Sequence, residues 1–129
     1  MESNTAQIIE ACTVGDINLI KSIDPKDLIA IRDSAQRNLI IIAAFHHQYH
    51  LVEYLLTIGF DINSTNKKGT SVLMYAKTKC MELEDFSFMT WLLKHGADLH
   101  HKDNFGKDIF YYANNIGNQE LITFLNKNK

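Results

Sequence analysis

The chain has 129 residues, of which 46% are hydrophobic and 22% are charged, and its formal net charge is −2. This much apolar material predicts a single domain spanning residues 1–129 with an elongated core, and it excludes a disordered tail or a set of several domains. The nearly balanced charge excludes a general attraction to nucleic acid or to anionic membranes, so electrostatic attraction must come from local patches.

The N-terminal stretch MESNTAQIIEAC lacks the basic start and the apolar run of a signal peptide, and no segment approaches the length of a membrane span. We therefore expect a cytoplasmic protein without membrane partners that is monomeric alone. Cys12 and Cys80 have no metal-like spacing, which favours reduced thiols in a reducing compartment.

Residues 4 to 32 predict a degenerate first unit of a helical repeat. Ala11 and the apolar pair Leu19-Ile20 keep landmarks that later units show more clearly. Asp24-Pro25 replaces the last turn of the second helix, because proline has no amide hydrogen with which to continue it. We expect an irregular hairpin loop from Lys26 to Arg32.

Residues 33 to 63 predict two helices and a hairpin-like loop. Asn38 can accept backbone N–H groups as an N-cap, so the first helix should begin at about Leu39. The polar run from 46 to 48 interrupts the apolar pattern, and apolar residues at 51, 52, 55 and 56 then form the stripe of a second helix. Gly59, just past the last apolar position, suits a left-handed helix C-cap.

The landmarks of this unit recur after 33 and then after 37 residues. The helix starts hold three different residues that can all cap a helix, and two further positions stay in register with them. These sets are Asn38, Ser71 and Asp108 at the caps, Gln36, Gly69 and Gly106 before them, and Ala43, Ala76 and Ala113 within the helices. The longer step indicates a four-residue insertion in the third unit, within Thr78 to Met89.

The inserted stretch reads TKCMELEDFSFM and is too apolar for a free loop. We expect it to extend both helices of the third unit and to pack an apolar edge against the fourth or the second unit, with a contact site as the alternative. The chain ends in the polar run Asn126-Lys127-Asn128-Lys129, where a fifth unit would need apolar residues. We therefore predict four repeats, approximately 1–32, 33–65, 66–102 and 103–129.

These stretches resemble the ankyrin repeat family, whose period is about 33 residues. The residues that carry the resemblance are NLIIIAAFHHQYHLVEYLLTIGFDIN, GTSVLMYAK with WLLKHGADLH, and DNFGKDIFYYANNIGNQELITFL. The family's Thr-Pro-Leu-His signature is replaced by NLII, SVLM and DIFY at the three helix starts. The resemblance implies an all-α fold, an ankyrin-type α-solenoid of helix-turn-helix repeats joined by hairpin loops.

The resemblance also implies a binding face, because partners of the family usually lie along the concave surface of hairpin tips and first helices. Carried over in register, this face holds one arginine, five lysines and no acidic residue. The candidate partner-binding residues are Arg37, Phe45, His46, Lys67, Lys68, Thr70, Lys79, Lys102, Asn104, Phe105, Lys107 and Asn115. Phe45 and Phe105 should lie outward as apolar anchors in a basic groove for an acidic protein or peptide, the alternative being that they fold back onto neighbours. Tyr111 and Tyr112 are predicted to be packing residues.

Histidines raise the alternative of a zinc or nickel site, since His46, His47 and His50 lie close together and His100-His101 form a second pair. The predicted turn separates the first group onto two helices, and ordinary turn polarity explains both groups. We predict no metal and no cofactor. No catalytic motif of adequate specificity is present in the sequence, so no enzyme is expected.

The predicted function is a non-enzymatic protein-interaction module for a protein or peptide partner, acting as an inhibitor, immunity protein, adaptor or effector. One alternative is nucleic-acid binding through Lys67, Lys68, Lys79, Lys102 and Lys107, although no arginine fork or stacking ladder accompanies them. Another is a metal-binding protein that uses the histidine groups.

Overall fold

The structure, a computed structural model, describes residues 2 to 129, and these residues fold into helices and loops without a named strand. An isolated antiparallel bridge joins Thr65 to Ser71. The helices are α1 (Glu2–Val14), α2 (Ile17–Lys21), α3 (Pro25–Ile29), α4 (Leu39–Phe45), α5 (Tyr49–Thr57), α6 (Val72–Leu83), α7 (Ser87–Lys94), α8 (Ile109–Ile116) and α9 (Gln119–Lys127).

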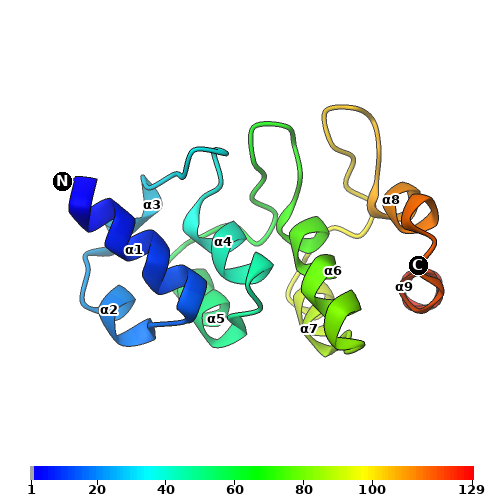
Figure 1. The fold of residues 1–129 in the computed structure, drawn as a ribbon, viewed down its shortest axis with the longest axis horizontal. Coiled ribbons are helices and arrows are strands. Elements are labelled where there is room, and N and C mark those ends of the chain that lie inside the picture. Colours follow the sequence, from blue (N-terminus) through cyan, green and yellow to red (C-terminus); the bar gives the residue numbers. More distant parts are fainter. Residues whose placement is uncertain (1) are drawn as a thin grey trace.

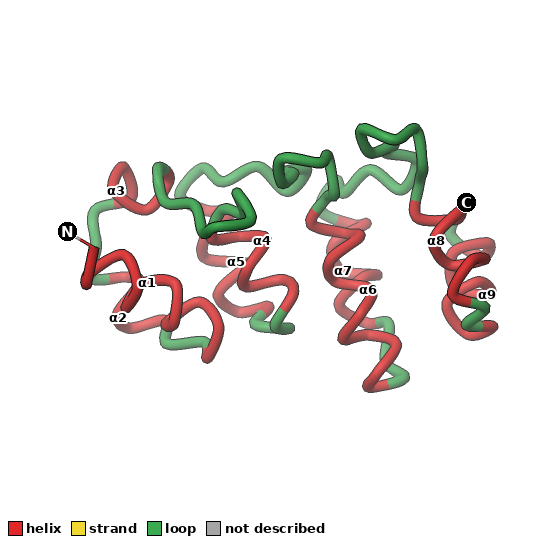
Figure 2. The backbone as a smooth tube through the Cα atoms, turned by 45° about the horizontal axis from the view of Figure 1, so that its top comes forward, coloured by secondary structure: helices red, strands yellow, loops and turns green. Residues whose placement is uncertain are grey.

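Pairs of antiparallel helices follow one another along the long axis of the molecule (Figure 1). Three longer connections lie along one edge, above the helices in the views shown (Figure 2). We call them the first loop (30–38), the second loop (58–71) and the third loop (95–108). Each helix pair thus presents its turn at one edge of the molecule and its long loop at the other.

The first helix of each later pair begins where the sequence predicted it. The side chains of Asn38, Ser71 and Asp108 accept hydrogen bonds from the backbone N–H groups three residues on, at 3.2, 3.2 and 2.9 Å. These bonds satisfy amide groups that have no partner within the helix. The three N-caps are therefore confirmed, although a different residue type provides each one.

Helix α4 lies at the centre of the core. Its residues 39 to 44 are all buried, because α4 packs against α1 on one side, α6 on the other and α5 beneath. A helix that is covered all round can be apolar all round, which explains the run LIIIAAF. By contrast α8, in the last pair, buries only Ile109 and Ala113.

The first loop region departs from the sequence prediction, because α3 forms within the expected irregular stretch. Asp24 caps this short helix by accepting the N–H of Lys26 at 3.1 Å, and Pro25 occupies its first position, where no amide hydrogen is needed. Leu28 is fully buried and holds the helix against the core. The Asp-Pro pair, which the sequence predicted to end the second helix, thus begins α3, whereas α2 already ends at Lys21.

The insertion extends one helix of the third pair and not both. Helix α6 has 12 residues against 7 in α4, whereas α7 has 8 against 9 in α5. The ring of Phe86 stacks on Phe124 of α9 at 5.1 Å, and the ring of buried Phe88 lies 5.5 Å from that of Tyr49. The apolar edge of the insertion therefore contacts both the second and the fourth helix pair.

Both cysteines are free and buried. Burial raises the pKa of the Cys12 thiol to about 12 and that of Cys80 to about 11, because the thiolate is disfavoured away from water. Both side chains therefore remain protonated and belong to the core.

Candidate functional site

The tips of the three loops share one backbone design. Asp33, Asn66 and Asp103 each accept the N–H groups of the residues two and four positions later, at 2.8 to 3.0 Å. A backbone hydrogen bond closes each tip between the same residue and the fourth residue after it, at 2.9 to 3.0 Å. Gln36, Gly69 and Gly106 reverse the chain there with φ of +62°, +83° and +73°.

The second and third loops are joined by hydrogen bonds. The N–H of Asn104 donates to the carbonyl of Lys68 and its side-chain amide donates to the carbonyl of Lys67, both at 3.0 Å. The Nε2 atom of His101 lies 2.7 Å from the carbonyl oxygen of Gly69, which can only accept, so this nitrogen carries the hydrogen.

Asn63 adds two further bonds between these two loops, because its side chain receives the N–H of Asp98 at 2.8 Å and donates to the carbonyl of Gly96 at 3.1 Å. The first and second loops differ, since no hydrogen bond joins residues 30–38 to 58–71 in the part of the chain that the structure describes. A hollow of about 460 Å³, lined by Gln36, Thr65, Asn66 and Lys67, lies there instead.

Positive charge is concentrated at the loop tips. Residues 31–37, 64–70 and 101–107 hold six cations and two acids, a net charge of +4 in a chain whose total is −2. The cations are Arg32, Arg37, Lys67, Lys68, Lys102 and Lys107. The carboxylate oxygens of the two acids, Asp33 and Asp103, accept hydrogen bonds from groups within the protein. The loop tips are therefore basic, whereas the three loops taken whole, which add Asp61, Asp98 and Asp108, have a net charge of +1.

Arg37 is already engaged within the protein. Its Nε lies 2.7 Å from a carboxylate oxygen of Asp33, and its guanidinium lies 5.5 and 5.7 Å from the rings of Phe45 and Tyr75. Burial alone would raise the pKa of Asp33, but hydrogen bonds and charge from Arg37 lower it below its usual range. Arg37 thus holds the first loop against α4 and α6.

Phe45 is half-buried, with its ring 5.7 Å from that of Tyr75 and 5.0 Å from that of His46. The expectation that Phe45 lies outward is therefore wrong, because Tyr75 of the next helix pair covers one side of it. Phe105 differs, since it is 64% exposed at the tip of the third loop. Of the two expected apolar anchors, only Phe105 is fully available.

His46 lies between charged side chains on the face of the first helices. Its partial burial and the nearby cations Arg37 and Lys79 lower its pKa, while Glu10 opposes them. Near the C-terminal end of α6, the ammonium of Lys79 lies 3.6 Å from a carboxylate oxygen of Glu82. Glu10 and Asp33 therefore place acids beside the face that the sequence predicted to hold none.

The remaining predicted residues lie mostly on the second and third loops. Lys67, Lys68, Lys102 and Asn104 are exposed there, whereas Thr70 is half-buried and donates its N–H to Asn66. Lys107 is also half-buried, and its ammonium lies 4.7 Å from the ring of Tyr111, a cation–π distance. Asn115 is exposed on α8.

Two tyrosines that the sequence analysis did not assign to this surface complete it. Tyr75 receives a hydrogen bond from Asn66 at 2.9 Å, and Tyr112 donates one to Asp103 in the equivalent position. Each tyrosine follows the acceptor side chain of its loop tip, Asn66 or Asp103, by nine residues, and this shared spacing was the signal available in the sequence. Tyr111 was predicted to pack, but it is 44% exposed and adds an aromatic ring beside Lys107.

The histidine groups do not assemble into a cluster. Among the described residues no group of three or more histidine, cysteine or acidic side chains is placed to hold a metal ion. His100 stacks on Phe110 at 5.9 Å while its neighbour His101 bonds to Gly69, so the two rings have separate partners.

Within residues 2 to 129, no helix combines the length and the apolar character that crossing a membrane requires.

No protein-family model matches the chain. Over 85 residues it is 27% identical to the Homo sapiens protein Transient receptor potential cation channel subfamily A member 1, which contains ankyrin repeats. The aligned stretch makes up 66% of this chain and 7% of the channel. This distant similarity is consistent with ankyrin repeats and with an interaction role.

Proposed function

We propose that this protein is a non-enzymatic, cytoplasmic interaction module, an ankyrin-type solenoid that binds an acidic segment of a protein partner along its basic loop tips. The binding surface comprises the tips of the second and third loops, residues 64–70 and 101–107, with Lys67, Lys68 and Lys102 as cations and Phe105 as the apolar anchor. The first helices, around His46 and Lys79, continue the surface.

The observation that carries this proposal is the separation of charge on a rigid support. Residues 64–70 and 101–107, the tips of the second and third loops, have a net charge of +3 in a chain of −2, and five hydrogen bonds fix the second loop against the third. A rigid surface loses little conformational entropy on binding, so exposed cations held there attract and orient an acidic partner. Phe105 adds the exposed apolar area that usually supplies most of the binding energy.

The test is affinity capture followed by mass spectrometry, with the captured protein then titrated against purified variants. Lys68→Glu and Phe105→Ala should each weaken binding about tenfold or more, because one reverses a contact charge and the other removes the anchor. Lys94 on α7 is also exposed, so Lys94→Glu is the matched control and should bind almost normally. Unchanged binding in both test variants would refute the loop tips as the site.

The same cations favour a second candidate, nucleic-acid binding, and an electrophoretic shift assay separates the two. Phosphate contacts would give binding to any DNA or RNA that falls steeply as salt rises. A shift at low salt that Lys67→Glu and Lys68→Glu abolish would replace the proposal with nucleic-acid binding. The absence of a shift leaves the acidic protein segment as the ligand.

A further inference from the structure

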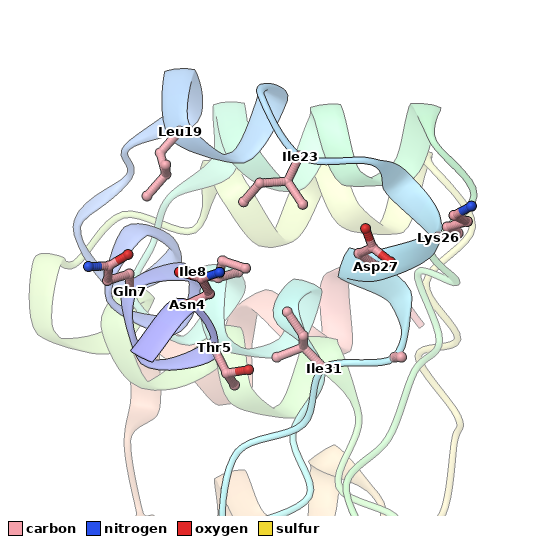
Figure 3. A pocket seen from close by; sticks show the side chains of 10 residues that line it. Asn4, Thr5, Gln7, Ile8, Leu19, Ile23, Lys26, Asp27 and Ile31 are labelled. Atoms are coloured by element: carbon pink, nitrogen blue, oxygen red, sulfur yellow. The ribbon is translucent and has the colours of Figure 1, made fainter. Parts of the chain in front are cut away.

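The first and the last helix pairs differ in how charge is placed beside their apolar side chains. A hollow of about 510 Å³ between α1, α2 and α3 includes Lys26 and Asp27 among its lining residues (Figure 3). One charge of each sign gives this hollow no preference for an acidic ligand. Between the third and fourth helix pairs, by contrast, lies a half-buried lysine, Lys77, that forms no ion pair within the part of the chain that the structure describes.

The ammonium of Lys77 lies on the loop side of α6. Its Nζ donates to the carbonyl of Met74, one turn earlier in the helix, at 2.9 Å. This direction is expected, because helical side chains lean toward the helix N-terminus, and the second loop leads into α6 at that end. The same Nζ lies 5.7 Å from the centre of the Tyr112 ring on α8. Lys77 therefore reaches from the third helix pair to the fourth, near the loops.

Tyr112 connects this ammonium with the tip of the third loop. Its hydroxyl donates to Asp103, whose backbone N–H closes the tip by donating to the carbonyl of Lys107 at 2.9 Å. The ring of Tyr111 meets that of Tyr112 edge to face at 5.3 Å, and the ammonium of Lys107 lies 4.7 Å from the Tyr111 ring. Two half-buried cations thus lie beside one pair of tyrosines, next to the tip that presents Phe105.

The charge of Lys77 is partly removed from water without a counter-charge in contact. No carboxylate oxygen of residues 2 to 129 lies within 4.0 Å of Nζ, and the bond to Met74 uses one of its three N–H donors. Asp103, the acid at the same tyrosine, accepts hydrogen bonds from the third tip and from Tyr112. Burial lowers the pKa of Lys77, because the ammonium loses hydration. A carboxylate from outside the protein would restore the lost stabilisation.

Arg37 shows what a paired cation looks like in the same setting. Its guanidinium lies 5.7 Å from the ring of Tyr75, the residue that matches Tyr112 in the preceding unit. Arg37 is neutralised by Asp33, with Nε 2.7 Å from a carboxylate oxygen. Lys77 lies at the same distance from its tyrosine and lacks such an acid.

The repeat does not require a lysine at position 77. The matching residue of the second unit is Ala44, which is fully buried, and that of the fourth unit is Asn114, which is exposed. Neither is charged. The cation at this position is therefore a feature of the third unit and not a part of the common helix packing.

We propose that Lys77 binds the carboxylate of one aspartate or glutamate in the partner's acidic segment, beside the tip of the third loop. This inference rests on the proposed function in taking an acidic segment as the ligand, and it adds a site on α6 to the loop tips. Exposed tip lysines attract any nearby acid, whereas a half-buried ammonium distinguishes a carboxylate from an amide at one position of the segment, because only the carboxylate pairs with its charge.

A fluorescein-labelled hexaglutamate peptide is the probe, and fluorescence anisotropy measures its binding. Lys77→Met keeps the apolar length of the side chain but removes the charge, so it should weaken binding about tenfold or more. Lys77→Arg keeps the charge and should bind within about threefold of the wild-type protein. Lys94→Met makes the same change at an exposed position of α7 and should bind normally.

Two further measurements separate binding from support of the fold. Lys77→Met should unfold at the same or a higher urea concentration than the wild-type protein, because it removes an unpaired, half-buried charge. In 15N NMR of the wild-type protein, the Nζ signal of Lys77 should shift in a saturable way with hexaglutamate. A hexaglutamine peptide, which has no carboxylate side chains, should leave this signal unchanged.

Normal hexaglutamate binding by Lys77→Met, or no saturable binding by the wild-type protein, would overturn the proposal. So would a joint loss of binding and of urea resistance in Lys77→Met, because Lys77 would then support the fold. Binding of hexathymidylate that Lys77→Met abolishes would assign the site to phosphate instead. Lys68→Glu distinguishes the two failures: if it alone weakens hexaglutamate binding, only the Lys77 site is wrong, and if neither variant does, the loop tips are wrong as well.

Discussion

The second and third loops are fixed to each other, whereas the first loop is held by other means. Five hydrogen bonds cross between residues 58–71 and 95–108. Between residues 30–38 and 58–71 the described chain has a hollow in place of such bonds, and the first loop is attached through Arg37 to the rings of Phe45 and Tyr75. One backbone design therefore supports two kinds of junction.

Single side chains at equivalent positions account for this difference. The side chains that join the second and third loops belong to Asn63, His101 and Asn104, and the earlier units have Ala30, Ser64 and Lys67 in their places. Alanine has no polar group, and the hydroxyl of Ser64 already donates to the carbonyl of Asp61 at 2.6 Å. Lys67 is exposed and carries charge. A repeated fold thus gains local rigidity without any change of its backbone.

The largest effect should come from the core, which is common to both junctions. Leu55 and Leu92 occupy matching positions in α5 and α7 and are fully buried. Leu55→Ala and Leu92→Ala should each lower the free energy of unfolding by about 2 to 5 kcal/mol, measured by urea denaturation. If the two variants lose similar free energies of unfolding, the difference between the two junctions lies in the loops. If the two losses differ greatly, the helices also contribute to that difference.

A smaller effect should come from Gly69, at the junction of the second and third loops. An added Cβ would lie 2.7 Å from the Oδ1 and 2.9 Å from the backbone N of Asn104, and φ is +83°. Gly69→Ala should therefore cost about 3 kcal/mol, through backbone strain and the separation of the two loops.

Gly106→Ala is the matched control for this effect, because φ is +73° but nothing lies within 4 Å of the added Cβ. Its cost should be about 1 kcal/mol, the strain alone. Equal costs at the two glycines would show that the contact between Gly69 and Asn104 contributes nothing to stability.

The sequence predicted the helix starts well because caps are local. Asn38, Ser71 and Asp108 needed only one acceptor atom each and a following apolar run. It did not predict α3, since the signal of Asp24-Pro25 is the same for the end of one helix and the start of another. It placed Phe45 outward because the covering ring, Tyr75, lies 30 residues away, and no local pattern shows that the two meet.

The polar bond at the base of each tip offers a third comparison, since Asn66 holds Tyr75 where Asp103 holds Tyr112. Burial favours a higher pKa for Asp103, but hydrogen bonds from Tyr112, Lys107 and Phe105 lower it. A lowered pKa in the folded state gives stability that is present above the unfolded value of about 3.9 and is lost as the pH falls through the folded value.

Asp103→Asn should therefore cost on the order of 1 kcal/mol at pH 7 and flatten the loss of stability below about pH 4. The reciprocal change, Asn66→Asp, should add acid dependence to the second loop. Thermal unfolding of both variants from pH 7 to pH 2 measures this, and an unchanged pH profile for Asp103→Asn would exclude Asp103 as its source.

The smallest effect should be a gain in stability at Gln36, the position of the first loop that matches Gly69. Gln36 has φ of +62°, where a side chain is strained, and its neighbours leave a hollow on the side of the second loop. Gln36→Gly should relieve the strain and raise the free energy of unfolding by about 0.5 kcal/mol, after the greater flexibility of glycine in the unfolded chain is subtracted. Ala35→Gly, one residue earlier and outside the positive-φ region, should instead lower the free energy of unfolding by about 0.5 kcal/mol.

Opposite signs at these neighbouring positions, measured as shifts of the urea midpoint at constant slope, would establish that strain in the first loop has no compensating contact. A loss at Gln36 would mean that its side chain supports the open junction, and the contrast with Gly69 would then lie in the contacts of the Gln36 side chain and not in backbone strain.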